Sequence, residues 1–167
     1  VNSNIKTMVA IACVIFFFIV LYYRSVTTGL VLLFSLATAN SLTYAFMAWK
    51  EVGLNVSTLP LAALGVGLGV DYGIYMIDRI KEEYQNLEVK SVHEAVHRAF
   101  LTAGNAIFIT AVTMIAPLLP WAFASPLRFQ AEMGMLLAMV LFMNMMGSLL
   151  FVPAALTALR PKALFKG

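Results

Sequence analysis

The sequence predicts an all-α polytopic membrane protein, a bundle of five transmembrane helices in a single domain over residues 1–167. Composition is the first reason: hydrophobic residues make up 62% of the chain and charged residues 11%, whereas soluble proteins average about 45–50% and about 25%. Spacing is the second reason, because the few charged residues divide the chain into apolar runs close to the ~20 residues that cross a bilayer. The net charge is +3, and the basic residues are scattered between these runs, so the charge does not indicate nucleic-acid binding.

Charged residues and prolines bound the expected helices. The first run lies between Lys6 and Arg24, and the second ends before Lys50. Pro117 and Pro120 are expected to kink or end the fourth helix, because proline removes a backbone donor and clashes with the preceding turn. The expected spans are residues 7–23, 26–49, 58–78, 100–123 and 132–157.

A short cytoplasmic surface helix is expected between the third and fourth spans, over residues 91–99. Ser91 and Glu94 have the spacing of a capping box, which marks a helix start. The apolar face predicted for this helix consists of Val92, Val96, Ala99 and Phe100.

The basic residues predict the orientation, since lysine and arginine are enriched on the cytoplasmic side. Five spans put the two termini on opposite sides of the membrane. One side holds Arg24, Arg79, Lys81, Lys90, Arg98, Arg160, Lys162 and Lys166, and the other holds Lys6, Lys50 and Arg128. The C-terminus is therefore expected in the cytoplasm and the N-terminus on the outer side.

The third span contains a carboxylate, Asp71, well inside its apolar run. A charged side chain near the bilayer centre costs at least ~2.5–3.5 kcal/mol, and such groups commonly handle protons, ions or substrate. Stepping around the helix at about 100° per residue places Gly65, Gly69 and Gly73 on one face, a pattern that allows close helix packing. Asp71 lies on another face, which it shares with Gly67, Tyr75 and Asp78. The alternative is that Asp71 only hydrogen-bonds a neighbouring helix.

The fourth span offers the expected polar partners for this carboxyl group. Asn105, Thr110 and Thr113 stand in otherwise apolar sequence, and their hydroxyl and amide groups can hydrogen-bond a carboxyl in either protonation state. Interhelical hydrogen bonding without proton traffic remains the alternative for each of them. His93 and His97 lack a third ligand, so no metal site is expected. No paired aspartates or Ser/His set lies inside the spans, so the sequence does not predict an enzyme.

The segment Gly65-Val-Gly-Leu-Gly-Val-Asp71-Tyr72-Gly-Ile-Tyr, followed by Asp78-Arg79-Ile-Lys-Glu82-Glu83, resembles the resistance–nodulation–division (RND) superfamily of proton-driven exporters. The Asp-Tyr pair is most similar to the branch of the mycobacterial large membrane proteins (MMPL) and of lipid exporters. This resemblance implies that Asp71 carries the proton, with Tyr72 beside it. It also implies export of hydrophobic or lipid-like substrates across a bacterial inner membrane, with the proton as coupling ion and no cofactor.

The resemblance further implies that the chain corresponds to the last five helices of one RND repeat, half of the transmembrane domain, which is similar to a sterol-sensing domain. Its partners would then be the bilayer, an N-terminal half and a periplasmic domain, and a homodimer could form through the face of Gly65, Gly69 and Gly73. Two alternatives remain: the protein-export auxiliaries SecD and SecF, whose motif helix also carries an aspartate, and a non-transporting module that binds lipid or sterol.

Overall fold

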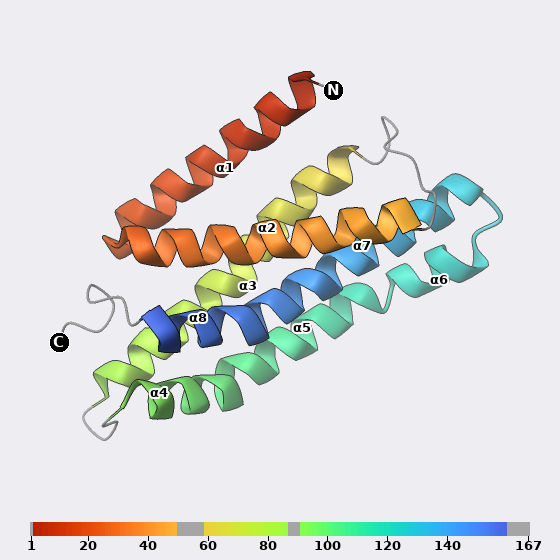
Figure 1. Ribbon diagram of the computed structural model, residues 1–167. Helices are drawn as coiled ribbons and strands as arrows, with labels where there is room; N and C mark the ends of the chain where they lie inside the picture. The colour runs from red at the N-terminus through yellow and green to blue at the C-terminus, as the bar shows by residue number, and fades with distance from the viewer. Residues whose placement is uncertain (1, 50–58, 87–90, 160–167) are drawn as a thin grey trace.

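Figure 1 shows the computed structural model, which describes residues 2–49, 59–86 and 91–159, with the side chains of residues 10, 13–49, 67–86 and 91–159. These residues form an elongated bundle in which consecutive long helices are antiparallel (Figure 1). The elements are α1 (Asn2–Tyr23), α2 (Val26–Trp49), α3 (Leu59–Gln85), α4 (Val92–Ala99), the π-helical segment η1 (Phe100–Gly104), α5 (Asn105–Ile115), α6 (Leu118–Ala124), α7 (Arg128–Met146), the π-helical segment η2 (Gly147–Phe151) and α8 (Val152–Leu159).

Three helical stretches among the described residues are long and apolar enough to cross a bilayer. They comprise 24 residues in Val26–Trp49, 33 in Val92–Ala124 and 32 in Arg128–Leu159. The predicted class, an all-α membrane protein, is thereby confirmed. Helix α1 has 22 residues and α3 has 27, and at 1.5 Å per residue they reach about 33 and about 40 Å. That these two helices also span the bilayer stays a prediction.

Helix α3 lies at the centre of the bundle. Its residues Met76, Ile77 and Ile80 are fully buried, in a core cluster to which α1, α2, α5 and α8 also contribute. Apolar burial alone does not hold helices together in lipid, because acyl chains are equally apolar, so close packing matters most. The central position of α3 fixes where its polar residues can point.

The helix expected at residues 91–99 is present as α4, but it is not a separate surface element. It continues through η1 into α5, and Ser91 caps it by accepting a hydrogen bond from the backbone N–H of Glu94 at 3.2 Å. Ala95 and Ala99 are fully buried in the bundle, whereas Phe100, which the sequence places on the same apolar face as Ala99, is 44% exposed. The small alanines allow α4 to pack closely in the bundle, and Phe100 stands about 100° further round the helix.

A proline ends α5 as expected. The helix stops at Ile115, a turn follows at Ala116 and Pro117, and α6 begins at Leu118. Pro120 lies in the first turn of α6, where its missing N–H would have no helical partner in any case.

Candidate functional site

The site is built around Asp71, in the middle of α3. Its side chain is exposed on the surface of the chain and lines a cavity of about 390 Å³. The cavity lies along the seam between α3 and α5, and its lining residues are Leu68, Asp71, Tyr72, Tyr75, Ala106, Ile107, Thr110 and Met114. Among the described residues, the Asp71 carboxylate makes no hydrogen bond or ion pair, so it remains available to bind a proton or a ligand.

Three of the five residues predicted for a proton relay meet at this cavity: Asp71, Tyr72 and Thr110. The Thr110 hydroxyl donates to the backbone carbonyl of Ala106 at 2.8 Å, which leaves its oxygen lone pairs available on the cavity side. The Tyr72 hydroxyl approaches the sulfur of Met114 at 3.6 Å, a contact that connects α3 to α5.

The other two predicted residues, Asn105 and Thr113, are exposed and do not belong to the described lining of the cavity. The hydroxyl of Thr113 donates to the backbone carbonyl of Thr110 at 2.9 Å, within its own helix. Serine and threonine hydroxyls in helices commonly donate to a backbone carbonyl of the preceding turn in this way. A polar residue in an apolar span therefore does not by itself indicate the face that binds a partner.

The cavity also contains residues that the polar pattern did not single out. Ala106, Thr110 and Met114 recur every four residues along α5 and so share one face. Stepping by four from Thr110 would have found both neighbours. Tyr75, expected on the face of Asp71, does line the cavity and is 57% exposed.

Two glycines of α3 allow it to pack closely against α2 and α7. A side chain at Gly69 would collide with the amide of Asn144 on α7, and one at Gly73 would collide with Leu32 on α2, whereas Gly67 has open space beside it. The packing role expected of Gly69 and Gly73 therefore agrees with their surroundings. The surroundings of Gly65 lie outside the described side chains.

This arrangement bears on the expected homodimer, which stays a prediction. The face expected to hold a second copy of the chain is already occupied by α2 and α7 of the same chain at Gly69 and Gly73. At these two positions, close packing leaves no room for a further helix.

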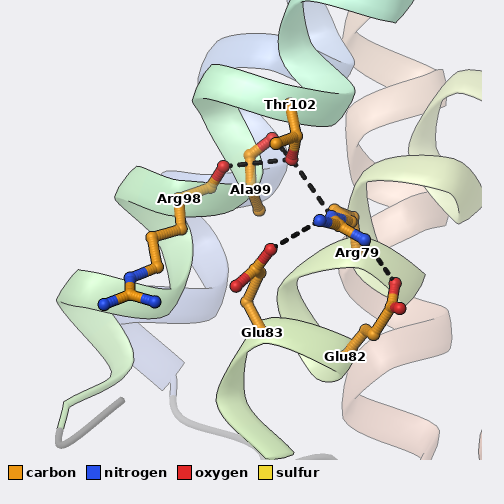
Figure 2. A network of polar contacts seen from close by, with 6 residues as sticks. All are labelled: Arg79, Glu82, Glu83, Arg98, Ala99 and Thr102. Carbon is orange, nitrogen blue, oxygen red and sulfur yellow. Dashed lines mark hydrogen bonds and ion pairs between the residues drawn. The ribbon is translucent and has the colours of Figure 1, made fainter. Parts of the chain in front are cut away.

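Polar contacts hold the charged end of α3 in place. Arg79 forms ion pairs with Glu82 and Glu83, each at 2.7 Å, and its Nε donates to Thr102 Oγ1 in η1 at 3.1 Å (Figure 2). Both ion pairs join residues three and four positions apart, which are neighbours on one helix face. On the other side of α3, the hydroxyl of the buried Tyr23 donates to Asp78 Oδ1 at 2.7 Å. α3 is thus connected to α1 and to the η1–α5 helix.

Fold and site together define an integral membrane protein of apolar helices with a carboxylate on its central helix, a composition and site typical of membrane transport rather than of soluble enzymes. The chain belongs to the MMPL family, whose model matches residues 2–166. This match confirms the resemblance to the MMPL branch of the RND superfamily and favours it over SecD and SecF.

Related proteins come from bacteria and archaea. The chain is 36% identical over 94 residues to the membrane protein SCO6666 of Streptomyces coelicolor, covering 56% of this chain and 13% of that protein. It is 26% identical over 136 residues to the membrane protein MJ1562 of Methanocaldococcus jannaschii, covering 81% and 34%. It is 30% identical over 104 residues to the trehalose monomycolate exporter MmpL3 of Mycolicibacterium smegmatis, covering 59% and 10%. The matched region thus covers between 10% and 34% of the length of each of these relatives.

Proposed function

We propose that this chain is the transmembrane part of a proton-driven exporter of hydrophobic or lipid-like substrates, in which Asp71 binds and releases the coupling proton. The observation that carries the proposal is the Asp71 carboxylate in the α3–α5 cavity, next to the tyrosine of the Asp-Tyr motif and opposite a hydroxyl. Membership of a family that includes a trehalose monomycolate exporter supports the lipid-like substrate class.

In this mechanism Asp71 alternates between a charged and a neutral form. The charged carboxylate favours water or hydrogen-bond donors, whereas the neutral form tolerates apolar surroundings. Tyr72 and Thr110 each bring to the cavity a hydroxyl group that can accept or donate a hydrogen bond as the proton arrives and leaves. Neutralising the acid lets α3 shift against its neighbours, and this movement would drive the rest of the transporter.

The proposal includes an orientation and an assembly. The excess of basic residues supports a C-terminus in the cytoplasm and an N-terminus on the periplasmic side of a bacterial inner membrane. The chain would act as the five C-terminal helices of one repeat, together with an N-terminal half and a periplasmic domain.

The test is Asp71→Asn in the intact protein, reconstituted in liposomes with a pH gradient and a fluorescent glycolipid as substrate. Asparagine keeps the size of the side chain and removes its proton exchange, so we expect proton-coupled export to be lost while folding is retained. Glu132→Gln is the matched control, because it makes the same acid-to-amide change on α7, at a residue outside the described lining of the Asp71 cavity. Export that persists in Asp71→Asn would disprove the proposal.

A non-transporting module that binds lipid is the second candidate, and one observation favours it. An apolar groove of about 610 Å³ lies between α2 and the η2–α8 helix, lined by Thr27, Leu30, Val31, Leu33, Phe34, Ala37, Phe151, Ala155 and Leu159. Lipid binding that is independent of pH and unchanged in Asp71→Asn, without any export by the unaltered protein, would favour this candidate.

A further inference from the structure

Two polar pairs lie along the seam between α3 and the η1–α5 helix. Near the charged end of α3, Arg79 Nε donates to Thr102 Oγ1 at 3.1 Å (Figure 2). Further along the seam, Asp71 and Thr110 line the same cavity. Arg79 follows Asp71 by as many residues as Thr110 follows Thr102. Because the two helices are antiparallel (Figure 1), both pairs belong to one register.

Arg79 is held rigidly enough to define that register. Its Nη1 and Nη2 atoms are engaged by Glu82 and Glu83 of its own helix at 2.7 Å each, and its Nε is directed at Thr102. Glu83 is only 9% exposed, so the ion pair between Arg79 and Glu83 lies largely inside the protein. The planar guanidinium suits such a multiple contact, because its donors have fixed directions.

Thr102 stands where the helix it belongs to is irregular. It lies in the π-helical segment η1, and its hydroxyl is directed at the backbone carbonyls of Arg98 and Ala99, at 3.0 and 3.3 Å (Figure 2). A π-turn holds one more residue than an α-turn, so its position decides how α5 is rotated relative to α4. Arg79 contacts the chain within this turn.

We propose that the Arg79–Thr102 hydrogen bond fixes the register of α5 against α3 and thereby keeps Thr110 in the wall of the cavity that Asp71 lines. Arg79 and Thr102 are then positioning residues of the proton site, and this role rests on the proposed function of Asp71. A slip of one residue would move α5 by about 1.5 Å and turn its side chains by about 100°. Thr110 would then leave the cavity wall.

The register is measured by disulfide cross-linking of the full chain in membranes, independently of transport. Cys13, the one cysteine of the sequence, is first replaced by alanine. Tyr75→Cys is then combined either with Ala106→Cys, which lies opposite it in the proposed register, or with Thr110→Cys, one turn further along. We expect the first pair to form its disulfide faster, and the ratio of the two rates reports the register.

Thr102→Val removes the acceptor while keeping the shape of the side chain, and we expect it to bring the two rates close to each other. Thr102→Ser restores the hydroxyl and should restore the ratio. Thr38→Val is the matched control, because the Thr38 hydroxyl donates to a carbonyl of its own helix at 2.8 Å on an exposed part of α2. An unchanged ratio in both Thr102→Val and Arg79→Gln would refute the proposal.

A second measurement, in the intact protein, separates positioning from a merely structural role. Besides Asp71, the titratable groups in the described cavity lining are Tyr72 and Tyr75, since the lining residues of α5 do not titrate. We therefore expect Thr102→Val to shift the pH of half-maximal export, and Thr102→Ser to reverse the shift. A changed cross-linking ratio with an unchanged pH profile would refute the positioning role.

The two proposals fail in different ways. Export that survives Asp71→Asn refutes the proton role of Asp71, while the cross-linking ratio still decides the register. If export is lost in Asp71→Asn but Thr102→Val leaves the cross-linking ratio unchanged, only the positioning role is refuted.

Discussion

Substitutions of two neighbouring glycines of α3 should have opposite effects on stability. At Gly67 an added Cβ meets nothing within 4 Å, whereas at Gly69 it would stand 2.9 Å from Nδ2 of Asn144 and still nearer to the other atoms of that amide. Gly→Ala in a helix interior gains up to about 1 kcal/mol from backbone entropy and propensity. Overpacking a well-packed site costs about 1–3 kcal/mol. We therefore expect Gly69→Ala to be about 2 kcal/mol less stable than Gly67→Ala.

The assay is reversible unfolding of the purified chain in mixed micelles with increasing SDS, followed by circular dichroism. The cost in stability of Gly69→Ala is also measured in a chain that carries Asn144→Ala, because the alanine on α7 leaves room for the new methyl group. The cost of Gly69→Ala should then be smaller than in the unaltered protein, a coupling of the kind that double-mutant cycles detect. Gly73→Ala should cost less than Gly69→Ala, since its Cβ would collide with one terminal methyl group of Leu32, whereas at Gly69 it would collide with three atoms of the Asn144 amide. Equal stability of Gly67→Ala and Gly69→Ala would refute the packing described for α3.

Three further changes test the contacts at the charged end of the bundle. Tyr23→Phe removes the 2.7 Å hydrogen bond to Asp78 and should cost about 1.5–3 kcal/mol in SDS unfolding, the range for bonds to charged groups; a cost below that range would mean that water replaces the hydroxyl. Ser91→Ala should cost about 1 kcal/mol as a lost N-cap, visible as faster hydrogen exchange at the start of α4, and unaltered exchange there would contradict the cap. Glu83→Gln should destabilise the chain more than Glu82→Gln, because the Glu83 side chain is 11% exposed and the Glu82 side chain 70%, and exposed ion pairs contribute little. The reverse order would contradict a stabilising role of the buried Arg79–Glu83 ion pair.

The fold could largely be predicted from the sequence because apolar runs and their charged boundaries are local features. Pro117, the Ser91 cap and the Arg79 ion pairs all depend on residues within one helical turn of each other, and the structure has each of them. The continuity of α4 with α5 could not be predicted in this way. It depends on how Ala95 and Ala99 pack inside the bundle, which sequence spacing alone does not give.

The site was predicted only in part, for a related reason. The cost of a carboxylate in an apolar helix identifies Asp71 from sequence alone. Polarity does not show which way its partners point: Thr110 and Thr113 are both exposed and both bond their own helix backbone, yet of the two only Thr110 belongs to the described lining of the cavity. The neighbours of Gly69 and Gly73 come from distant helices, so no local pattern could name Asn144 or Leu32.

The described lining of the Asp71 cavity comes from α3 and α5 alone, and the acid reaches the outer surface of its own chain. In a bilayer, whatever touches the uncovered side has to accommodate this group, and acyl chains do so poorly when it is ionised. A neighbouring surface that offers water, an amide or a hydroxyl is energetically preferred over lipid, and protonation weakens that preference. Assembly around α3 and the protonation of its aspartate are therefore thermodynamically linked, so that each should depend on the pH that governs the other.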